Sequence, residues 1–214
     1  MDITRSKEIL EYWIPKNGKA DYDKWFFKSS NYDNEIKEKF GDLLKEAEQG
    51  KGFGWLVSKD SFVAYIILMD QFSRHIYRGT PDAYKNDNGT LIFTELGFDI
   101  YKNQLNGYEF LFAFMPYMHT ESLQYQEKGL SKFNDIYYSI KYKNNNLSNL
   151  NLNDTLSCLN YSEMIENMHH HVTGHYVVIR DFNRFPKRNK ILGRTSTPKE
   201  IVYLNDKTIK NRDY

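Results

Sequence analysis

The sequence predicts an all-α fold formed as a single domain over residues 1–214. Apolar residues recur every three or four positions in most segments, which is the spacing of one face of a helix. Residues that favour helix starts and stops stand at the borders of these segments. The length of 214 residues suits one core, because a domain commonly has roughly 100 to 200 residues.

The N-terminal part predicts two helices. The first runs from Arg5 to Trp13, where apolar side chains form one face. The second covers about Asp33–Gln49, with Asn31 or Ser30 as its cap. Gly50 stands where a helix commonly ends, because glycine adopts the left-handed backbone without strain.

The next helix, from Ser58 to about Tyr77, carries apolar residues on more than one face, which indicates a central and largely buried element. Antiparallel helix pairs are expected along the rest of the chain. The remaining predicted helices cover about residues 91–103, 108–115, 121–138, 161–181 and 198–204. The last has a complete capping box, with Thr197 as the cap, Pro198 in first position and Glu200 three residues after the cap.

Two segments carry little helix signal. Residues 141–154 are rich in Asn and are interpreted as a loop or local insertion, and residues 205–214 as a C-terminal tail. The single cysteine, Cys158, excludes an internal disulfide and is expected to be a buried or inert thiol. The N-terminus is polar and lacks the features of a targeting signal, and the most apolar run, Tyr108–Met118, is shorter than a membrane span. We therefore expect a cytoplasmic protein with no membrane partner.

Charge is balanced over the chain but locally concentrated. The formal net charge is +1, so no general attraction to nucleic acid or anionic membranes is expected. The segment Arg180–Arg194, however, holds six cations and one anion in fifteen residues. Its guanidinium groups suit phosphate or carboxylate, since a planar fork can donate two parallel hydrogen bonds. RNA binding is the weaker interpretation, because one short basic segment in a neutral chain is more often a solvated or ion-paired loop.

The central helix carries a polar cluster. Asp70 and Arg74 are four residues apart and can pair on one face, which Arg78 extends by a turn. Gln71 and His75 form a second polar row beside it. A structural ion pair accounts for the first row alone. Two adjacent rows on an apolar helix also favour the lining of a pocket.

Residues 119–126 add a second group of candidates. Thr120 is a plausible cap for the helix expected from Glu121, whose carboxylate suits a positive helix start. His119 is able to donate to a ligand or to Asp70, although a structural role is the more common one for a lone histidine. Gln126 comes near these residues if the helix begins late, and we treat it as a supporting residue.

A run of histidines on the helix expected over residues 161–181 raises the question of a metal site. His171 and His175 are four residues apart, as metal-binding histidines often are. A zincin-type site requires Glu after the first His, and Val172 stands there. We expect neither a metal nor a cofactor.

Five motifs are spread over nearly the whole chain: Ile9–Trp13, Trp25–Asp33, Leu68–Asp87 and the segments 116–126 and 175–194. Together they resemble the domain of unknown function 924 family. The resemblance implies an all-α fold similar to tetratricopeptide-repeat proteins, with no established activity. The positions that match the family pattern and that we select as site residues are Asp70, Gln71, Arg74, Arg78, His119, Glu121, Gln126, His175, Arg184, Arg188, Asn189 and Arg194.

The chain also departs from the family pattern. Ser73 and His75 stand where Pro and Asn are usual, and Asn183 and Lys187 stand where Gly and His are usual. The resemblance therefore implies no role for His75 or Lys187.

Three functional hypotheses follow. The first is a pocket that binds a small anionic molecule or an acidic peptide end through the selected arginines, acids and histidines. The second is a metal-independent hydrolase or transferase acting on a phosphorylated substrate, with His119 or His175 as general base and Glu121 or Asp70 orienting it. The third is a tetratricopeptide-like scaffold that binds another protein.

Overall fold

The computed structural model of the protein describes residues 1–15, 20–26, 29–142 and 158–206. The regular elements within these ranges are all helical, which confirms the predicted fold class. Most of the predicted loop at 141–154 and most of the predicted tail at 205–214 lie outside the described residues, as does the side chain of Cys158. The tetratricopeptide-like superhelix and the single-domain organisation remain predictions.

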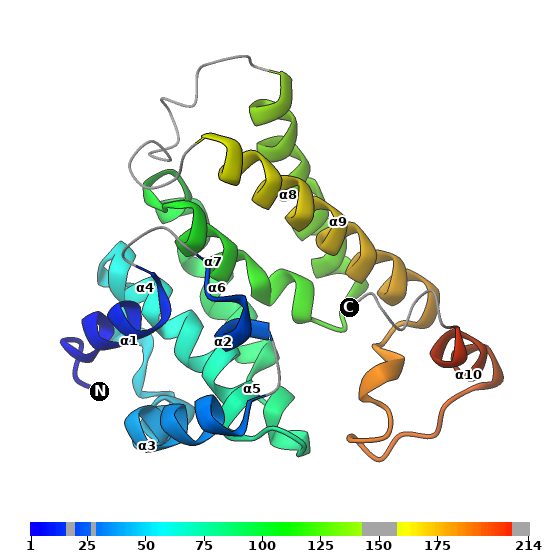
Figure 1. Cartoon of the computed structure of the whole chain (residues 1–214), viewed down its shortest axis with the longest axis horizontal. Helices are drawn as coiled ribbons and strands as arrows, with labels where there is room; N and C mark the ends of the chain where they lie inside the picture. The colour runs from blue at the N-terminus through cyan, green and yellow to red at the C-terminus, as the bar shows by residue number, and fades with distance from the viewer. Residues whose placement is uncertain (16–19, 27–28, 143–157, 207–214) are drawn as a thin grey trace.

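Three helices form the N-terminal part (Figure 1): α1 (Arg5–Trp13), α2 (Tyr22–Phe26) and α3 (Ser30–Glu46). The bounds of α1 are those predicted. The cap predicted for α3 was wrong, because the extended residue before the helix is Ser29, and its side chain makes no capping hydrogen bond. After α3 the chain makes a π-helical turn, in which Gly50 has a φ of 79°. This left-handed residue ends the helix where the sequence predicts it to end.

The central helix is continuous but irregular. It consists of α4 (Lys59–Ile66), a π-helical turn η3 (Ile67–Phe72) and α5 (Ser73–Ile76). Ser58 caps its start, because the hydroxyl oxygen accepts from the Ser61 backbone N–H. Every residue from Ser61 to Ser73 is buried, which confirms the central position predicted from the apolar pattern.

Four longer helices follow in two pairs: α6 (Asp87–Tyr101) with α7 (Gly107–His119), and α8 (Leu123–Tyr142) with α9 (Cys158–Phe182). Figure 1 shows α8 and α9 lying side by side along one edge of the molecule. A capping box between Asn106 and Glu109 starts α7, which continues past Pro116 to its end. The helix is therefore longer than the predicted range of 108–115.

The core consists of one large cluster and one small cluster. Buried side chains of α1 to α4, η3 and α6 to α9 form the large cluster, which is rich in aromatic rings such as those of Trp13, Phe72 and Phe112. The small cluster joins Val178 and Ile179 of α9 to Phe185 in the segment that follows. The chain then ends its described part in α10 (Pro198–Asn205), which has the predicted capping box.

Candidate functional site

Five side chains from separate parts of the chain form a connected set of ion pairs and hydrogen bonds, which we call the central network. Its members are Asp70, Arg74, Asp87, His119 and Arg188. They come from η3, α5, α6, the end of α7 and the segment after α9. Helix packing thus brings together residues that are up to 118 positions apart, from Asp70 to Arg188.

Asp70 is the most deeply placed acid of the central network, and its side chain is fully buried. One carboxylate oxygen accepts from Arg74 at 3.1 Å and from His119 Nδ1 at 2.7 Å, and the other accepts from Gln71 at 2.6 Å. Burial alone acts to raise the pKa of Asp70, but the interactions with His119 and Arg74 outweigh it and hold the pKa well below the usual range. Asp70 is therefore an anion at neutral pH.

Asp87 joins two guanidinium groups. Its two oxygens accept from Arg74 and from Arg188, each at 2.8 Å. Both guanidinium groups also lie over the ring of Tyr84, at 5.4 Å for Arg74 and 4.5 Å for Arg188. Arg188 additionally donates to the backbone oxygen of His119 at 3.0 Å. The site residues selected from the sequence omitted Asp87, although it lies within the family-like motif Leu68–Asp87, and Tyr84, which carries no charge to mark it.

Two neutral histidines adjoin this arrangement. Because ionised Asp70 only accepts hydrogen bonds, His119 carries its proton on Nδ1 and leaves Nε2 as the acceptor. Burial and the charge of Arg74 lower the pKa of His119. His175 lies nearby on α9, with 6.2 Å between the two ring centres, and its Nδ1 bonds to the backbone oxygen of His171. Burial lowers the pKa of His175 to about 3.

Glu121 pairs with Arg194 rather than starting a helix. Its carboxylate accepts two hydrogen bonds from Arg194, at 2.6 and 2.9 Å, and one from the Phe185 backbone N–H at 2.7 Å. The helix predicted from Glu121 begins at Leu123, and the Thr120 hydroxyl accepts from the Ser122 backbone N–H. The predicted helix start was wrong because Glu121 holds the C-terminal segment instead.

Two further predicted residues make contacts within this C-terminal segment. Arg184 donates to both oxygens of Glu200, at 2.6 and 2.8 Å. Asn189 is buried and its side-chain oxygen accepts from Arg194 at 3.0 Å. The guanidinium groups of Arg184 and Arg194 therefore donate to carboxylates of this chain, those of Glu200 and Glu121.

Gln126 is also a supporting residue. Because α8 begins late, the side-chain amide of Gln126 reaches back and donates to the backbone oxygens of Met118 and Thr120 at 2.8 and 2.9 Å. These two bonds fix the turn that carries His119.

Arg78 and His75 belong to a different cluster. Arg78 donates to both oxygens of Asp33 on α3, at 2.6 and 2.9 Å, and His75 Nδ1 lies 2.8 Å from the same carboxylate. The expectation that Arg78 extends the Asp70 face was wrong, because α5 ends at Ile76 and the chain turns away before Arg78. Gln71 and His75, which were predicted to form one polar row, also lie in different clusters, since Gln71 bonds to Asp70 and His75 to Asp33.

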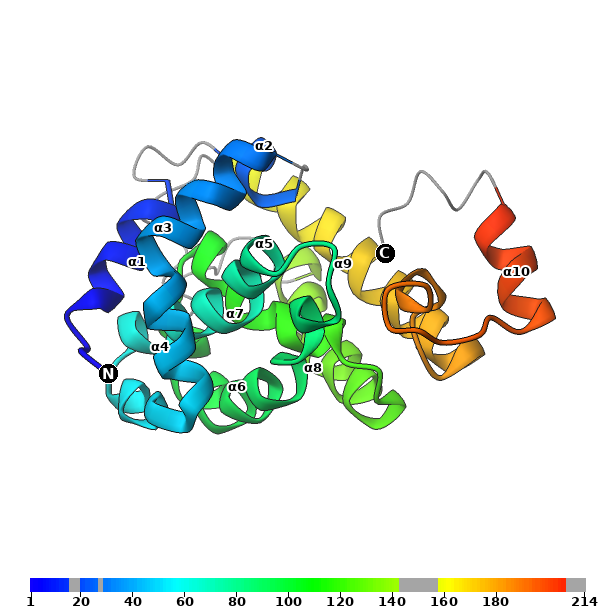
Figure 2. The same ribbon diagram turned by 90° about the horizontal axis from the view of Figure 1, so that it is seen from below.

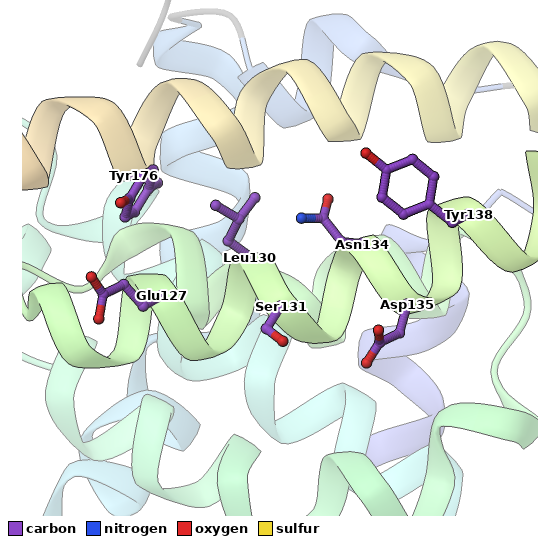
Figure 3. Close-up of a pocket in the computed structure, with 7 residues that line it drawn as sticks. All are labelled: Glu127, Leu130, Ser131, Asn134, Asp135, Tyr138 and Tyr176. Atoms are coloured by element: carbon purple, nitrogen blue, oxygen red, sulfur yellow. The ribbon is translucent and has the colours of Figure 1, made fainter.

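Two surface cavities among the described residues lie away from the central network. One, of about 360 Å³, lies between α8 and α9 (Figure 3), and its lining residues are Glu127, Leu130, Ser131, Asn134, Asp135, Tyr138 and Tyr176. The other, of about 370 Å³, is lined by Glu8, Glu11, Tyr12, Lys39 and Phe40. Neither includes a site residue selected from the sequence.

Among the described residues, no three His, Cys, Asp or Glu side chains are grouped as metal ligands would be. None of the helices in this part of the chain combines the length and apolar character needed to cross a membrane.

Comparison with known proteins agrees with the resemblance that the sequence motifs carry. A family model described as bacterial protein of unknown function (DUF924) matches residues 9–208. The chain belongs to the DUF924 family. A solved structure of a protein of unknown function, ATU0120 from Agrobacterium tumefaciens, is 27% identical, with a TM-score of 0.73. The match covers 94% of this chain and 97% of that one. No curated protein matches the chain.

One local feature of this DUF924 protein explains a departure from the family pattern. Asn183, where the sequence comparison expects Gly, has a φ of 55° immediately after the end of α9. Its backbone N–H donates to Ile179 at 2.8 Å, which is the geometry of a left-handed helix end. Asn is the side chain that tolerates this conformation best after Gly.

Proposed function

We propose that this DUF924 protein binds a small anion at the partly exposed edge of the central network, through Arg74 and Arg188. The ligand would be a carboxylate or phosphate, either free or at the end of a peptide. The observation that supports this proposal is a surplus of hydrogen-bond donors. The Nε of Arg74 is buried without a partner in the described structure, although nearly all buried polar groups in proteins have one.

The donor count extends this argument to both arginines. Each guanidinium group has five N–H donors. Arg74 donates three hydrogen bonds within the protein, one of them long at 3.5 Å, and Arg188 donates two. Their side chains keep 20% and 12% of their surface exposed. The remaining donors suit the oxygens of a planar carboxylate or a phosphate.

Charge balance sets the kind of recognition to be expected. Asp70 and Asp87 carry two negative charges and Arg74 and Arg188 two positive ones, while His119 is neutral. A ligand would therefore be held by directional hydrogen bonds at short range rather than by a strong positive field. Such a site favours ligands whose oxygens fit the two guanidinium planes.

A second candidate function is hydrolysis or transfer on a phosphorylated substrate, with His119 as general base. The specific observation that favours it is the short bond from His119 Nδ1 to Asp70, which fixes the tautomer and leaves Nε2 able to take a proton. The lowered pKa of His119 keeps that nitrogen unprotonated at neutral pH. Arg188, bound to the backbone of the same residue, would then hold the phosphate.

Thermal denaturation with phosphate, phosphorylated metabolites and carboxylates tests anion binding. A ligand at about 100 times its dissociation constant adds about 2.7 kcal/mol, and this corresponds to a Tm increase of about 5–10 °C for a chain of this size. Arg188→Gln should lose the increase. Arg184→Gln is the matched control, because it removes an arginine paired with Glu200 outside the network. An equal increase in wild type and Arg188→Gln would contradict the proposal, as would no increase with any anion.

Turnover of the same phosphorylated compounds separates the two candidates. If His119 is a general base, His119→Gln should keep the ligand-induced increase in Tm and lose about 100-fold or more in turnover. Absence of turnover by the wild-type protein on compounds that raise its Tm would leave binding as the function and reject the enzyme.

A further inference from the structure

One ring nitrogen of His119 has no hydrogen-bond partner among the described residues. Nδ1 carries the proton and donates to Asp70 at 2.7 Å, so Nε2 has a lone pair and is able only to accept. The side chain is 17% exposed, and Nε2 is not one of the fully buried polar atoms without a partner. Nε2 is therefore an acceptor that a group from the solvent can reach.

The neighbouring imidazole of His175 cannot donate to this nitrogen. The two ring centres lie 6.2 Å apart. Nδ1 of His175 lies 2.8 Å from the backbone oxygen of His171, which only accepts, so the proton of His175 is on Nδ1 and its Nε2 is also an acceptor. Burial lowers the pKa of both histidines, so both rings are neutral at neutral pH. Two neutral rings with these tautomers cannot form a hydrogen bond between their Nε2 atoms.

The guanidinium groups of the proposed anion site adjoin His119. Arg74 donates at 3.1 Å to the same carboxylate oxygen of Asp70 that accepts from His119. Arg188 donates at 3.0 Å to the backbone oxygen of His119 itself. Figures 1 and 2 show the chain that follows α5 and the segment that follows α9 facing each other on the side of the body nearest α10. An anion bound by the two arginines would therefore also meet the ring of His119.

A site that combines several donors with one acceptor discriminates between anions. The oxygens of sulfate or of a simple carboxylate offer only lone pairs at neutral pH, so an oxygen placed against Nε2 would bring two acceptors together. Such a ligand would displace water from Nε2 without replacing its hydrogen bond, which lowers affinity. An anion with a donor beside its charged oxygens avoids this loss.

We propose that the anion bound by Arg74 and Arg188 also carries a hydrogen-bond donor, which it gives to Nε2 of His119. Two kinds of ligand share this chemistry: a phosphate that retains a proton, and a carboxylate with a hydroxyl on the adjacent carbon. This inference rests on the proposed anion binding and adds to it the class of anion.

Isothermal titration calorimetry near neutral pH with two pairs of small anions tests this class. Inorganic phosphate retains a proton at this pH, whereas sulfate, which has the same tetrahedral shape, does not. Lactate and propionate differ by one hydroxyl group. In at least one pair, the member with the donor should bind about 5- to 10-fold more tightly, which is the usual contribution of one hydrogen bond.

The two pairs also separate this inference from the function on which it rests. A preference for phosphate identifies a protonated phosphate as the ligand class, and a preference for lactate identifies a 2-hydroxy acid. Equal affinities within both pairs, or tighter binding of sulfate and propionate, would overturn the inference and leave anion binding intact. No binding of any of the four compounds would contradict anion binding itself.

His119→Phe tests whether His119 is the acceptor. The substitution removes Nε2 and keeps a planar ring, so the preference within the pair should be lost. His169→Phe is the matched control, because His169 bonds to Asn134 of α8, outside the central network, and this variant should keep the preference. A preference that persists in His119→Phe would reject His119 as the acceptor.

A measurement on the wild-type protein covers the case in which His119→Phe does not fold, since that substitution also removes a partner of buried Asp70. The ¹⁵N NMR signal of His119 Nε2 should move when the donor-bearing anion of the preferred pair is added. The other member of the pair should leave the signal in place. Equal movement with both members would overturn the proposal.

Discussion

At the scale of single residues, the central network is an arrangement of charges that are costly to bury singly and tolerable together. Asp70 has no exposed side-chain surface, and all its partners are donors. Removing one member of a buried pair leaves the other charge unsolvated and unpaired. The contribution of Asp70 to stability is thus tied to Arg74, which also depends on Asp87.

Asp70→Asn should lower the free energy of unfolding by about 2–4 kcal/mol, because the substitution leaves buried Arg74 with one carboxylate partner in place of two. Asp99→Asn is the matched control. Asp99 also bonds two cations, Lys102 and Lys132, but its side chain is 55% exposed. Its loss should cost less than about 1 kcal/mol. Urea denaturation of both variants measures the free energy of unfolding. Equal losses in the two variants would show that the burial of Asp70 does not determine its contribution to stability.

At the scale of elements, irregularities in the helices determine where the side chains of the site residues lie. The π-helical turn η3 contains Asp70 and Gln71 and precedes the short α5 that carries Arg74. Such turns are uncommon inside helices and are frequent at functional sites. The left-handed residue Asn183 likewise turns the chain after α9, so that the following segment brings Arg188 back to Asp87.

Asn183→Gly should keep or raise the free energy of unfolding, whereas Asn183→Val should lower it by about 1–2 kcal/mol. Glycine adopts a positive φ without strain, and a β-branched side chain meets the backbone there. Because both substitutions change the same position, each is the control for the other. Thermal denaturation that ranks Val above Gly at this position would show that the left-handed conformation is not required.

At the scale of the whole molecule, the C-terminal segment is fastened largely by polar contacts. Its own apolar cluster is small, with Val178, Ile179 and Phe185. Ion pairs between this segment and the body join Arg188 to Asp87 and Arg194 to Glu121. Burial acts to raise the pKa of Glu121, but its hydrogen bonds with Arg194 and the Phe185 N–H outweigh burial and lower it. Acid should therefore loosen this part of the protein, because the stability that ionised Glu121 contributes is lost as the pH falls through that lowered pKa.

His175 adds a pH dependence that begins at milder acidity. Its pKa is about 3 in the folded protein, and an unfolded histidine has a pKa of about 6.5. Between these values the unfolded chain binds a proton that the folded chain does not. The stability that neutral His175 contributes is thus complete above about pH 6.5 and is lost as the pH falls toward 3.

His175→Gln should make the decline in unfolding free energy between about pH 6 and 4 shallower by up to about 1.4 kcal/mol per pH unit. Urea denaturation at several pH values measures this slope. His170→Gln is the matched control, because it removes an exposed histidine of the same helix in place of a buried one. Equal slopes for the wild type and His175→Gln would contradict the assigned role of burial.

Local patterns were sufficient for most helices and for some contacts. Apolar spacing predicted α1 and the buried central helix, and the capping box at Thr197 predicted the start of α10. The pairing of Asp70 with Arg74, and the possible donation from His119 to Asp70, were also expected. These features depend on neighbours along one helix or on residue types with few alternative partners.

The sequence by itself determined the all-α fold class and the family, because helical periodicity and the family motifs are both properties of residues near one another in the chain. Only the tertiary structure decided the partners of the charged residues. Arg194 bonds to Glu121 and Arg78 to Asp33, across 73 and 45 positions, because the π-helical turn, the late start of α8 and the bend at Asn183 set the direction of each side chain. Ion pairs are short-ranged contacts, and small rotations of the helices therefore determine which carboxylate each arginine meets.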